Sequence, residues 1–391
     1  MGERSLCRRR RTRAAGARAL GLAVLAATAS AGCAGISSRF DSWVLSQKAA
    51  LIAIGAQAPS APPSLPFIRS SELEWMTRPL ELPEIAVAPL ERHRIGDPAL
   101  TQEELTFESA FRLQYPESDI ARAYVYRKGK LGERPVVLWS PGQSTSDASF
   151  AGLIPYFRKI LARDADVVFF VPPYHLERTP AGYASGDAFL ATEFPDHLNA
   201  FAQATADMRV LIAWLRAQGV RQLGAMGSSM GSWILLRVAS WDDSFAFLTV
   251  IVPVIRWELL MYQPEMAPIR DRLLAIGLSA EEAVRAYRAL DPTPMRPRVD
   301  PRRISVFYGR YDRVAPEPPI LEWVERWGVR RVEAFDRGHA TMFFSPELAR
   351  HVEAGIDRDL RALGLVEHGE EHGAVNHRSP AFKPVGWPMT D

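Results

Sequence analysis

The stretch Leu223–Val238 reads LGAMGSSMGSWILLRV and decides the fold of the chain. A short apolar run predicts a strand over 222–226, and the apolar residues after Gly231 predict a helix. Between them stands the pattern G-x-S-x-G, with Ser229 at its centre and Gly227 and Gly231 on either side. Small residues at these positions let a strand turn sharply into a helix, which lifts the serine above the sheet. The stretch predicts a nucleophile at Ser229; the plainer alternative is a glycine-rich turn in which Ser229 caps the helix.

A serine hydroxyl is a weak nucleophile, so it needs a base and a carboxylate that orients the base. The predicted strand 304–308 leads into GRYDRVAP, which contains Asp312, and the predicted strand 329–335 leads into DRGHA, which contains His339. Because parallel sheets assemble their sites at the carboxyl ends of strands, Asp312 is the expected orienting acid and His339 the expected general base. Three other carboxylates remain alternatives for the acid: Asp336, Asp291 and Glu258.

From residue 107 onward, apolar runs alternate with helical patterns, which is the order of a mostly parallel sheet covered by helices. The chain is therefore expected to be an α/β protein whose sheet begins antiparallel. The helix before the serine turn has apolar residues on one face between Ala204 and Leu215 and can end at Gly219. Further predicted strands cover residues 107–114, 121–127, 135–140, 167–171 and 245–255.

The serine turn, the G-x-x-D-x-x-x-P loop at Asp312, the Gly-His turn at His339 and their order along the chain resemble the α/β-hydrolase superfamily over residues 105–365. The resemblance implies a serine esterase or lipase-like member with a helical lid over about 256–300. It also implies an oxyanion hole formed by backbone N–H groups of Met230 and, from the loop 140–144, Gln143. Such an enzyme forms an acyl-enzyme on Ser229 and needs no cofactor.

The substrate class stays open within this resemblance. Cleavage of carboxylic esters, from small molecules or lipids, is the expected activity, and peptidase or amidase activity is the alternative. A different class is also open, a catalytically silent protein that binds a partner in the cell envelope. These readings differ in whether Ser229 can be acylated and whether amides turn over.

Composition excludes several other classes. With 391 residues and 47% hydrophobic content, the chain can fill a sizeable core. Its 47 basic and 45 acidic residues leave a net charge of +2, too small for a nucleic-acid-binding protein. The two cysteines, Cys7 and Cys33, both precede the body of the chain, so a disulfide framework or a thiolate metal site is not expected there. No dinucleotide fingerprint, phosphate-binding loop or H-E-x-x-H pattern occurs, and neither a metal nor a cofactor is expected.

The first 32 residues predict an export signal. Arginines crowd residues 8–18, and the run 19–31 carries no charge but is too short to span a membrane as a helix. Two cleavage patterns compete, because Ala29–Ala31 fits an ordinary signal peptidase whereas SAGC ending at Cys33 resembles a bacterial lipobox. The second would leave Cys33 acylated and the protein attached to a membrane; the first predicts a periplasmic or secreted protein.

Residues 33–104 are expected to form a helix and a linker. Apolar residues between Ile36 and Leu51 recur at helical spacing, and the segment 59–66 is rich in proline. The helix either packs its apolar stripe on the domain or lies on a membrane surface. At the other end, residues 366–391 predict a solvated, disordered tail, although its histidines leave a metal site as the alternative. These histidines are His368, His372 and His377.

Overall fold

The computed structural model describes residues 34–55, 82–110, 112–192, 194–275 and 279–363. The predicted export signal, Cys33, the proline-rich segment 59–66 and the tail 366–391 lie outside these residues, so the predictions for them stay predictions. Within the described part, no helix combines the length and the apolar content that crossing a membrane requires.

The described residues build one sheet of nine strands in the order β1-β2-β3-β5-β4-β6-β7-β8-β9. The strands from β4 to β9 run parallel to their neighbours, whereas β1, β2 and β3 pair antiparallel, and β3 is also antiparallel to β5. The sheet is therefore mostly parallel with an antiparallel beginning, as predicted. The strands are β1 (Ala86–Pro89), β2 (Thr101–Glu108), β3 (Ile120–Arg127), β4 (Val136–Ser140), β5 (Asp166–Val171), β6 (Leu223–Ser228), β7 (Phe245–Ile251), β8 (Ile304–Gly309) and β9 (Arg331–Phe335).

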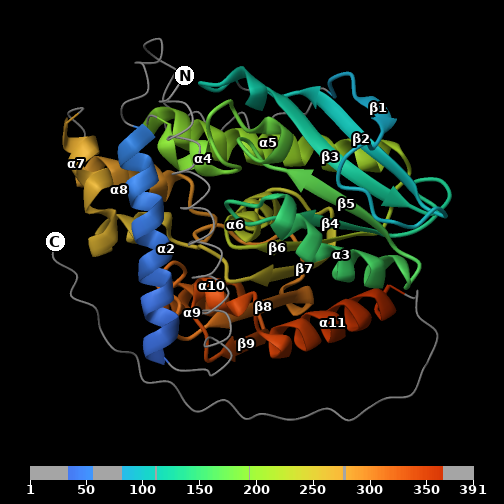
Figure 1. Ribbon diagram of the computed structural model, residues 1–391. Helices are drawn as coiled ribbons and strands as arrows, with labels where there is room; N and C mark the ends of the chain where they lie inside the picture. The colour runs from blue at the N-terminus through green and yellow to red at the C-terminus, as the bar shows by residue number, and fades with distance from the viewer. Residues whose placement is uncertain (1–33, 56–81, 111, 193, 276–278, 364–391) are drawn as a thin grey trace, which may run out of the picture.

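Helices cover both faces of this sheet (Figure 1). One layer contains α3 (Asp147–Leu161) and α11 (Pro346–Arg361), and the other contains α5 (Phe194–Ala217), α6 (Met230–Ala239) and α9 (Glu317–Trp327). The central strands are mostly apolar because successive side chains point into opposite layers that are both buried. In β4, Val136 and Leu138 belong to the core under α5 and α6, whereas Val137 and Trp139 belong to the core under α3 and α11.

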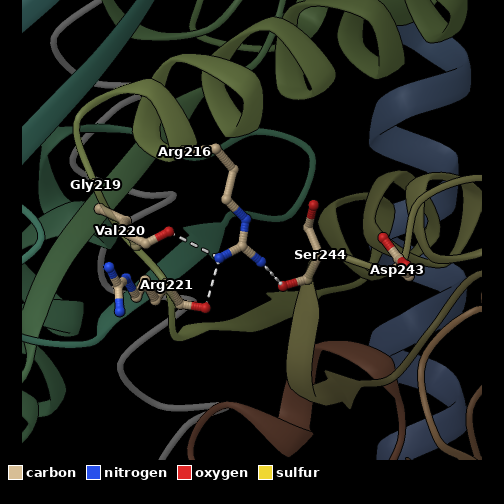
Figure 2. A pocket seen from close by; sticks show the side chains of 6 residues that line it. All are labelled: Arg216, Gly219, Val220, Arg221, Asp243 and Ser244. Atoms are coloured by element: carbon tan, nitrogen blue, oxygen red, sulfur yellow. Dashed lines mark hydrogen bonds between the residues drawn. The ribbon is translucent and has the colours of Figure 1, made fainter.

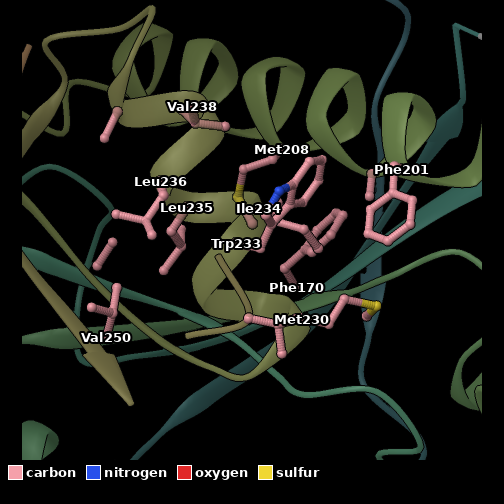
Figure 3. Close-up of a cluster of buried hydrophobic side chains, with 14 of the residues drawn as sticks. Phe170, Phe201, Met208, Met230, Trp233, Ile234, Leu235, Leu236, Val238 and Val250 are labelled. Carbon is pink, nitrogen blue, oxygen red and sulfur yellow. The ribbon is translucent and has the colours of Figure 1, made fainter. Parts of the chain in front are cut away.

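The helix α6 is buried on all sides, which explains its uninterrupted apolar sequence. Figure 3 shows its side chains packed against those of α5 and the sheet. Trp233 of α6 meets the ring of Phe201 edge to face, with 4.6 Å between ring centroids. The helix that follows Ser229 is thus fixed by the core, and Ser229 is fixed with it.

The chain reverses its direction of travel across the sheet at β4. From β4 it passes through α3 to β5 on one side, then returns through α4 (Asp187–Ala191) and α5 to β6 on the other side of β4. The connections after β4 and β6 therefore lead to helices on opposite faces of the sheet, α3 and α6. A crevice at such a point is where open parallel sheets place their ligands.

The start of the sheet differs from the sequence prediction. The strand predicted over 107–114 is wrong, since β2 covers Thr101–Glu108, and the sheet already begins at Ala86, ahead of the predicted boundary at 105. β2 carries acidic residues that look unlike a strand, but arginines of β3, each two positions along from the residue directly opposite, pair with two of them. These pairs are Glu103 with Arg127 at 2.8 Å and Glu104 with Arg122 at 2.6 Å.

The segment between β7 and β8 is helical, which agrees with the insertion predicted over 256–300. It contains η4 (Trp257–Tyr262), η5 (Pro264–Met266), α7 (Ala267–Ala275), α8 (Ala280–Ala289) and η6 (Pro301–Arg303). That this insertion moves as a lid stays a prediction. Two further short helices, η2 (Pro116–Ser118) and η3 (Leu176–Arg178), lie in the loops after β2 and β5.

The helix predicted near the N-terminus is α2 (Ala34–Gly55). It packs on the domain rather than standing apart, in contact with α4, α7, η5 and the short helix α10 (His339–Met342). Phe40 and Leu45 bury their side chains in these contacts. Figure 1 shows α2 lying across one end of the sheet, from α4 and the insertion helices to α10. Of the two predicted roles for this helix, packing on the domain is the one observed.

Candidate active site

Ser229 sits at a sharp turn between β6, which ends at Ser228, and α6, which begins at Met230. Its backbone has φ 51° and ψ −118°, a combination that a residue with a Cβ rarely adopts. The strain is held in place because the Ser229 N–H donates to the carbonyl oxygen of Ile251, at 2.8 Å, and because α6 is buried. Residues whose backbone is held in such a strained conformation cluster at functional sites.

The glycines around Ser229 are required by close contacts. A Cβ on Gly231 would overlap the carbonyl oxygens of Ser140 and Pro141, and a Cβ on Gly227 would lie 2.9 Å from the backbone of Gly231. These contacts bring the loop after β4 against the start of α6. In the same loop, a Cβ on Gly142 would lie 3.3 Å from that of Ser229. The loop after β4 therefore borders the serine directly.

The three residues that the sequence singles out lie in one chain of hydrogen bonds. His339 Nε2 is 2.9 Å from Ser229 Oγ, and His339 Nδ1 is 2.8 Å from Asp312 Oδ2. The other oxygen of Asp312 accepts the backbone N–H groups of Val314 and Ala315, at 2.8 and 2.7 Å. Because a carboxylate only accepts, Nδ1 carries the imidazole proton and Nε2 is free to accept the proton of Ser229. The arrangement can make the hydroxyl of Ser229 nucleophilic.

The other carboxylates considered for the acid are engaged elsewhere. Asp336 pairs with Arg310 at 2.7 Å, and the buried Glu258 pairs with Arg256. Asp291 accepts the backbone N–H of Thr293 at 2.8 Å. Of the four carboxylates proposed from sequence, Asp312 is the one that the structure brings to His339.

Opposing effects set the pKa of His339, whose side chain is only 12% exposed. Burial lowers the pKa of the imidazole, but the charge of Asp312, its hydrogen bond and the charge of Asp41 raise it above its usual value. The site therefore stabilises the positively charged imidazole that would form if Ser229 lost its proton.

Of the two residues predicted to supply N–H groups to the oxyanion hole, Met230 directly follows Ser229 in the chain and Gln143 directly follows Gly142, which borders Ser229. Met230 is the first residue of α6, where a backbone N–H has no partner within the helix. Gln143 follows Gly142, and its side chain is occupied by the carbonyl oxygen of Gly186 (2.9 Å) and the hydroxyl of Ser144 (2.8 Å). These hydrogen bonds turn the Gln143 side chain toward Gly186 and Ser144.

Two buried groups that support the site were not predicted from the sequence. His175 accepts the N–H of Ser144 on Nε2, at 3.1 Å, and so holds the loop after β4. Asp41, on α2, accepts the N–H of His339 at 2.7 Å. The signal for Asp41 was present but weak: a single acidic residue beside the apolar stripe of a helix, since buried carboxylates need partners.

Comparison with solved structures identifies the fold. An acetyl xylan esterase from Paenibacillus sp. R4 superposes with a TM-score of 0.54 at 14% sequence identity, over 77% of this chain and 97% of the other. Acetyl xylan esterase 1 from Thermoanaerobacterium sp. JW/SL YS485 gives a TM-score of 0.49 at 15% identity, over 70% and 88% of the two chains. The chain has the α/β-hydrolase fold. The identities are low, so the likeness concerns the fold alone.

Sequence comparison adds relatives without a known activity. No protein-family model matches the chain. An uncharacterized protein of Mycobacterium tuberculosis, in strains CDC 1551 / Oshkosh and ATCC 25618 / H37Rv, is 29% identical over 195 residues, which is 49% of this chain. The match spans 46% of that relative, less than half of its own length.

A pocket lies at the opposite end of this α/β-hydrolase sheet. It has a volume of about 490 Å³, and its lining residues precede the starts of β6 and β7, whereas Ser229 follows the end of β6. Figure 2 shows the guanidinium of Arg216 crossing it to the carbonyl oxygens of Val220, Arg221 and Ser244. This arginine joins the loops before β6 and β7, and the pocket contains none of the residues around Ser229.

Proposed function

We propose that the protein is a serine hydrolase that cleaves carboxylic ester bonds through an acyl-enzyme intermediate. The observation that carries the proposal is the chain of hydrogen bonds from Ser229 through His339 to Asp312, at 2.9 and 2.8 Å, on a strained turn at the carboxyl end of β6. Each member stands in the relation that nucleophile, base and orienting acid require.

In the acylation step, Ser229 Oγ attacks the carbonyl carbon of the ester while His339 Nε2 takes its proton. Asp312 holds the imidazolium through Nδ1–H and remains ionised. The carbonyl oxygen becomes an oxyanion, which accepts hydrogen bonds from the backbone N–H groups of Met230 and Gln143. The intermediate collapses as His339 returns the proton to the leaving alcohol, and the acyl group stays on Ser229.

Deacylation repeats these steps with water. His339 Nε2 takes a proton from the water as its oxygen attacks the acyl carbon, and the same two N–H groups hold the second oxyanion. The proton then returns to Ser229 Oγ and the carboxylic acid leaves. The site thus regains its starting state with no group beyond the chain's own residues and water.

One further observation supports esters as the substrates, and another supports the cell envelope as the location of the protein. The Paenibacillus protein with the same fold is named as an esterase, and its name is the reason to test esters first. The arginine-rich start and the uncharged run 19–31 support export to the bacterial envelope, with Cys33 as a lipid attachment point.

A fluorophosphonate probe tests the nucleophile directly. We expect labelling of the purified protein at Ser229, mapped by mass spectrometry, and loss of the label in Ser229→Ala. The matched control is Ser228→Ala, which removes the neighbouring hydroxyl at the variable position of the motif and should keep the label. A folded wild-type protein that takes no label would refute the acyl-enzyme mechanism and favour a silent binding protein.

The ester preference needs a second measurement. Nitrophenyl esters of graded acyl length should turn over, and the corresponding nitroanilides should be cleaved at least about 100-fold more slowly. Comparable kcat/KM values for amides would replace the ester assignment with a peptidase or amidase of the same mechanism. Activated esters also hydrolyse without the site. Ser229→Ala must therefore abolish whichever activity is found, or that activity does not come from Ser229.

A further inference from the structure

Asp41 is a carboxylate from the N-terminal helix that is buried against the site. Its exposed fraction is 0%, and its two oxygens accept three backbone N–H groups. Oδ2 accepts from His339 at 2.7 Å and from Arg313 at 3.1 Å, and Oδ1 accepts from Ala340 at 3.1 Å. These donors come from two loops that follow β8 and β9. One side chain on α2 therefore ties together two loops that the sequence places almost three hundred residues away.

The two loops are those that carry the proposed acid and base. Arg313 directly follows Asp312, and the N–H of His339 belongs to the base itself. The fit is tight, because a Cβ on Gly338 would lie 2.6 Å from Asp41 Oδ2, although its φ of −94° is open to any residue. Glycine stands at 338 because this carboxylate occupies the space.

A second contact of α2 strengthens the attachment. Ser37, one helical turn before Asp41, receives a hydrogen bond from the hydroxyl of Thr341, at 3.3 Å. Thr341 in turn accepts the N–H of Gly338 at 2.9 Å. The start of α10, and with it the backbone of His339, is thus held from α2 at two levels.

The charge of Asp41 also acts on the base. The ionisable groups that face it are Asp312 and His339, while the side chain of Arg313 turns to Glu265 on η5 and to Ser42. Burial and the nearby Asp312 raise the pKa of Asp41 to about 6, although His339 and the backbone N–H groups oppose the shift. In the other direction, the charge of Asp41 helps to raise the pKa of His339.

We infer that Asp41 is a positioning residue of the reaction: its carboxylate holds the Asp312 and His339 loops together and stabilises the imidazolium that forms when Ser229 is deprotonated. The inference rests on the proposed function of that site. It makes α2 part of the active site, where the sequence suggested only a helix ahead of a linker.

Asp41→Asn tests the inference because it preserves size while removing the charge and one acceptor oxygen. We expect kcat/KM for a nitrophenyl ester to fall about 10- to 100-fold through kcat, with KM within about twofold. The pH of half-maximal kcat/KM on the acid side should move down, because His339 loses a negative neighbour. The rate of fluorophosphonate labelling should show the same fall and the same shift.

Asp336→Asn is the matched control. It removes the same charge from the loop that carries His339, but its side chain is 59% exposed and paired with Arg310. Rates and pH profile should stay as in the wild type. If Asp41→Asn leaves both unchanged, or lowers activity and melting temperature together with no shift of the profile, Asp41 has no more than a structural role and the inference is wrong.

Gly338→Ala provides a second test that keeps every charge, should Asp41→Asn fail to fold. The added Cβ displaces the Asp41 carboxylate, so kcat/KM should fall at least about tenfold while the protein remains folded by circular dichroism. Wild-type rates in Gly338→Ala would overturn the inference. A wild-type protein without labelling or ester turnover would instead refute the proposed function, and the inference with it.

Discussion

At the scale of single residues, the site depends on what surrounds the imidazole of His339. Its two nitrogens are fixed by Asp312 and Ser229, so the tautomer needed for proton transfer is already present. The carboxylates of Asp312 and Asp41 have the same effect on the imidazole, because the charge of each raises the pKa of His339 and so favours its protonated form. Two carboxylates therefore raise the pKa of His339. Asp312 is hydrogen-bonded to its ring, and Asp41 is hydrogen-bonded to its backbone N–H.

Asp312→Asn should separate orientation from electrostatics. An amide in place of the carboxylate disfavours the tautomer with Nδ1–H, so kcat should fall by about 10⁴-fold. The activity that remains requires neutral His339, whose pKa is lower without the charge of Asp312. The acid limb of the pH profile should therefore move to lower pH, measured as log kcat/KM between pH 4 and 9.

Glu258→Gln is the control for this variant, since Glu258 was an alternative acid but pairs with Arg256. It should retain kcat within about threefold if it folds as the wild type does. An Asp312→Asn protein with nearly full activity would mean that another group orients His339.

The proximity of Ser229, Asp312 and His339 was predictable because each stands in a local pattern at a strand end. Asp41 was not, because its role depends on contacts across the whole chain, with the N–H groups of Arg313, His339 and Ala340. Its neighbours in sequence report only a helix with an apolar stripe. No local pattern states which backbone groups a buried carboxylate will meet.

At the scale of elements, the loop after β4 is held by groups outside it. His175, in the loop after β5, donates Nδ1–H to the carbonyl oxygen of Pro173 (2.7 Å) and accepts the N–H of Ser144 on Nε2. Complete burial lowers the pKa of His175 to about 4, so the ring stays neutral and remains an acceptor. The backbone of the proposed oxyanion loop thus depends on a histidine that must not be protonated.

His175→Gln should make the protein less sensitive to acid. In the wild type the folded pKa of about 4 lies below the value of 6.5 for an unperturbed histidine. The stability due to the neutral ring is complete above pH 6.5 and is lost as pH falls, because the unfolded chain binds the proton first. Between pH 7 and 4.5 this linkage removes about 2 to 3 kcal/mol. Urea unfolding at the two pH values should show a loss in the wild type that is larger by about this amount than the loss in His175→Gln, since the buried His197, whose pKa is also lowered to about 4, acts in both proteins.

Activity distinguishes the two uses of this side chain. The Oε1 atom of glutamine can accept the N–H of Ser144, so His175→Gln should keep most of its activity at pH 7, whereas His175→Ala should lose at least about tenfold because the loop relaxes. Removal of one oxyanion donor costs 10²- to 10³-fold, which sets the upper limit. Equal acid losses in the wild type and His175→Gln would show that His175 does not control this part of the stability.

The elements themselves were predictable to different degrees. The buried parallel strands β4 to β8 were predictable because they are apolar runs bounded by turns. Their predicted bounds match the observed ones within a few residues. β2 was not predictable in this way, because it contains Glu103 and Glu104, which form ion pairs with diagonally placed arginines of the neighbouring strand β3. Cross-strand pairing, and not the strand's own hydrophobicity, selects Thr101–Glu108.

At the scale of the whole molecule, α2 connects parts of the domain that meet at the site. Asp41 and Ser37 attach it to α10, whereas Lys48 attaches it to α4 through an ion pair with Asp187 of 2.7 Å. α4 begins after Gly186, whose backbone lies against His175 and Ser144. The helix α2 thus extends from the loop that carries His339 to α4, whose first residues follow the backbone that packs against His175 and the loop after β4.

This placement gives the lipobox pattern a structural consequence. Cys33 directly precedes Ala34, the first residue of α2, and Asp41 follows Ala34 by about 10 Å along the helix axis at 1.5 Å per residue. A lipid on Cys33 would therefore hold the site close to a membrane surface. Substrates carried by that membrane would then be presented at high effective concentration.

Cys33→Ser should release the protein from the membrane without harming its chemistry. Expressed in bacteria supplied with labelled palmitate, the wild type should fractionate with membranes and carry the label, whereas Cys33→Ser should be soluble and unlabelled. Cys7→Ser is the matched control, because Cys7 lies within the predicted export signal and its replacement should change neither property.

On soluble nitrophenyl esters the mature wild type and the mature Cys33→Ser protein should have equal kcat/KM, since Asp41, His339 and Ser229 keep their contacts. On esters embedded in vesicles, Cys33→Ser should be at least about tenfold slower, because it lacks the anchor that concentrates the site at the surface. A soluble, unlabelled wild type would instead establish ordinary signal cleavage after residue 31, and α2 would then hold the site together without tying it to a membrane.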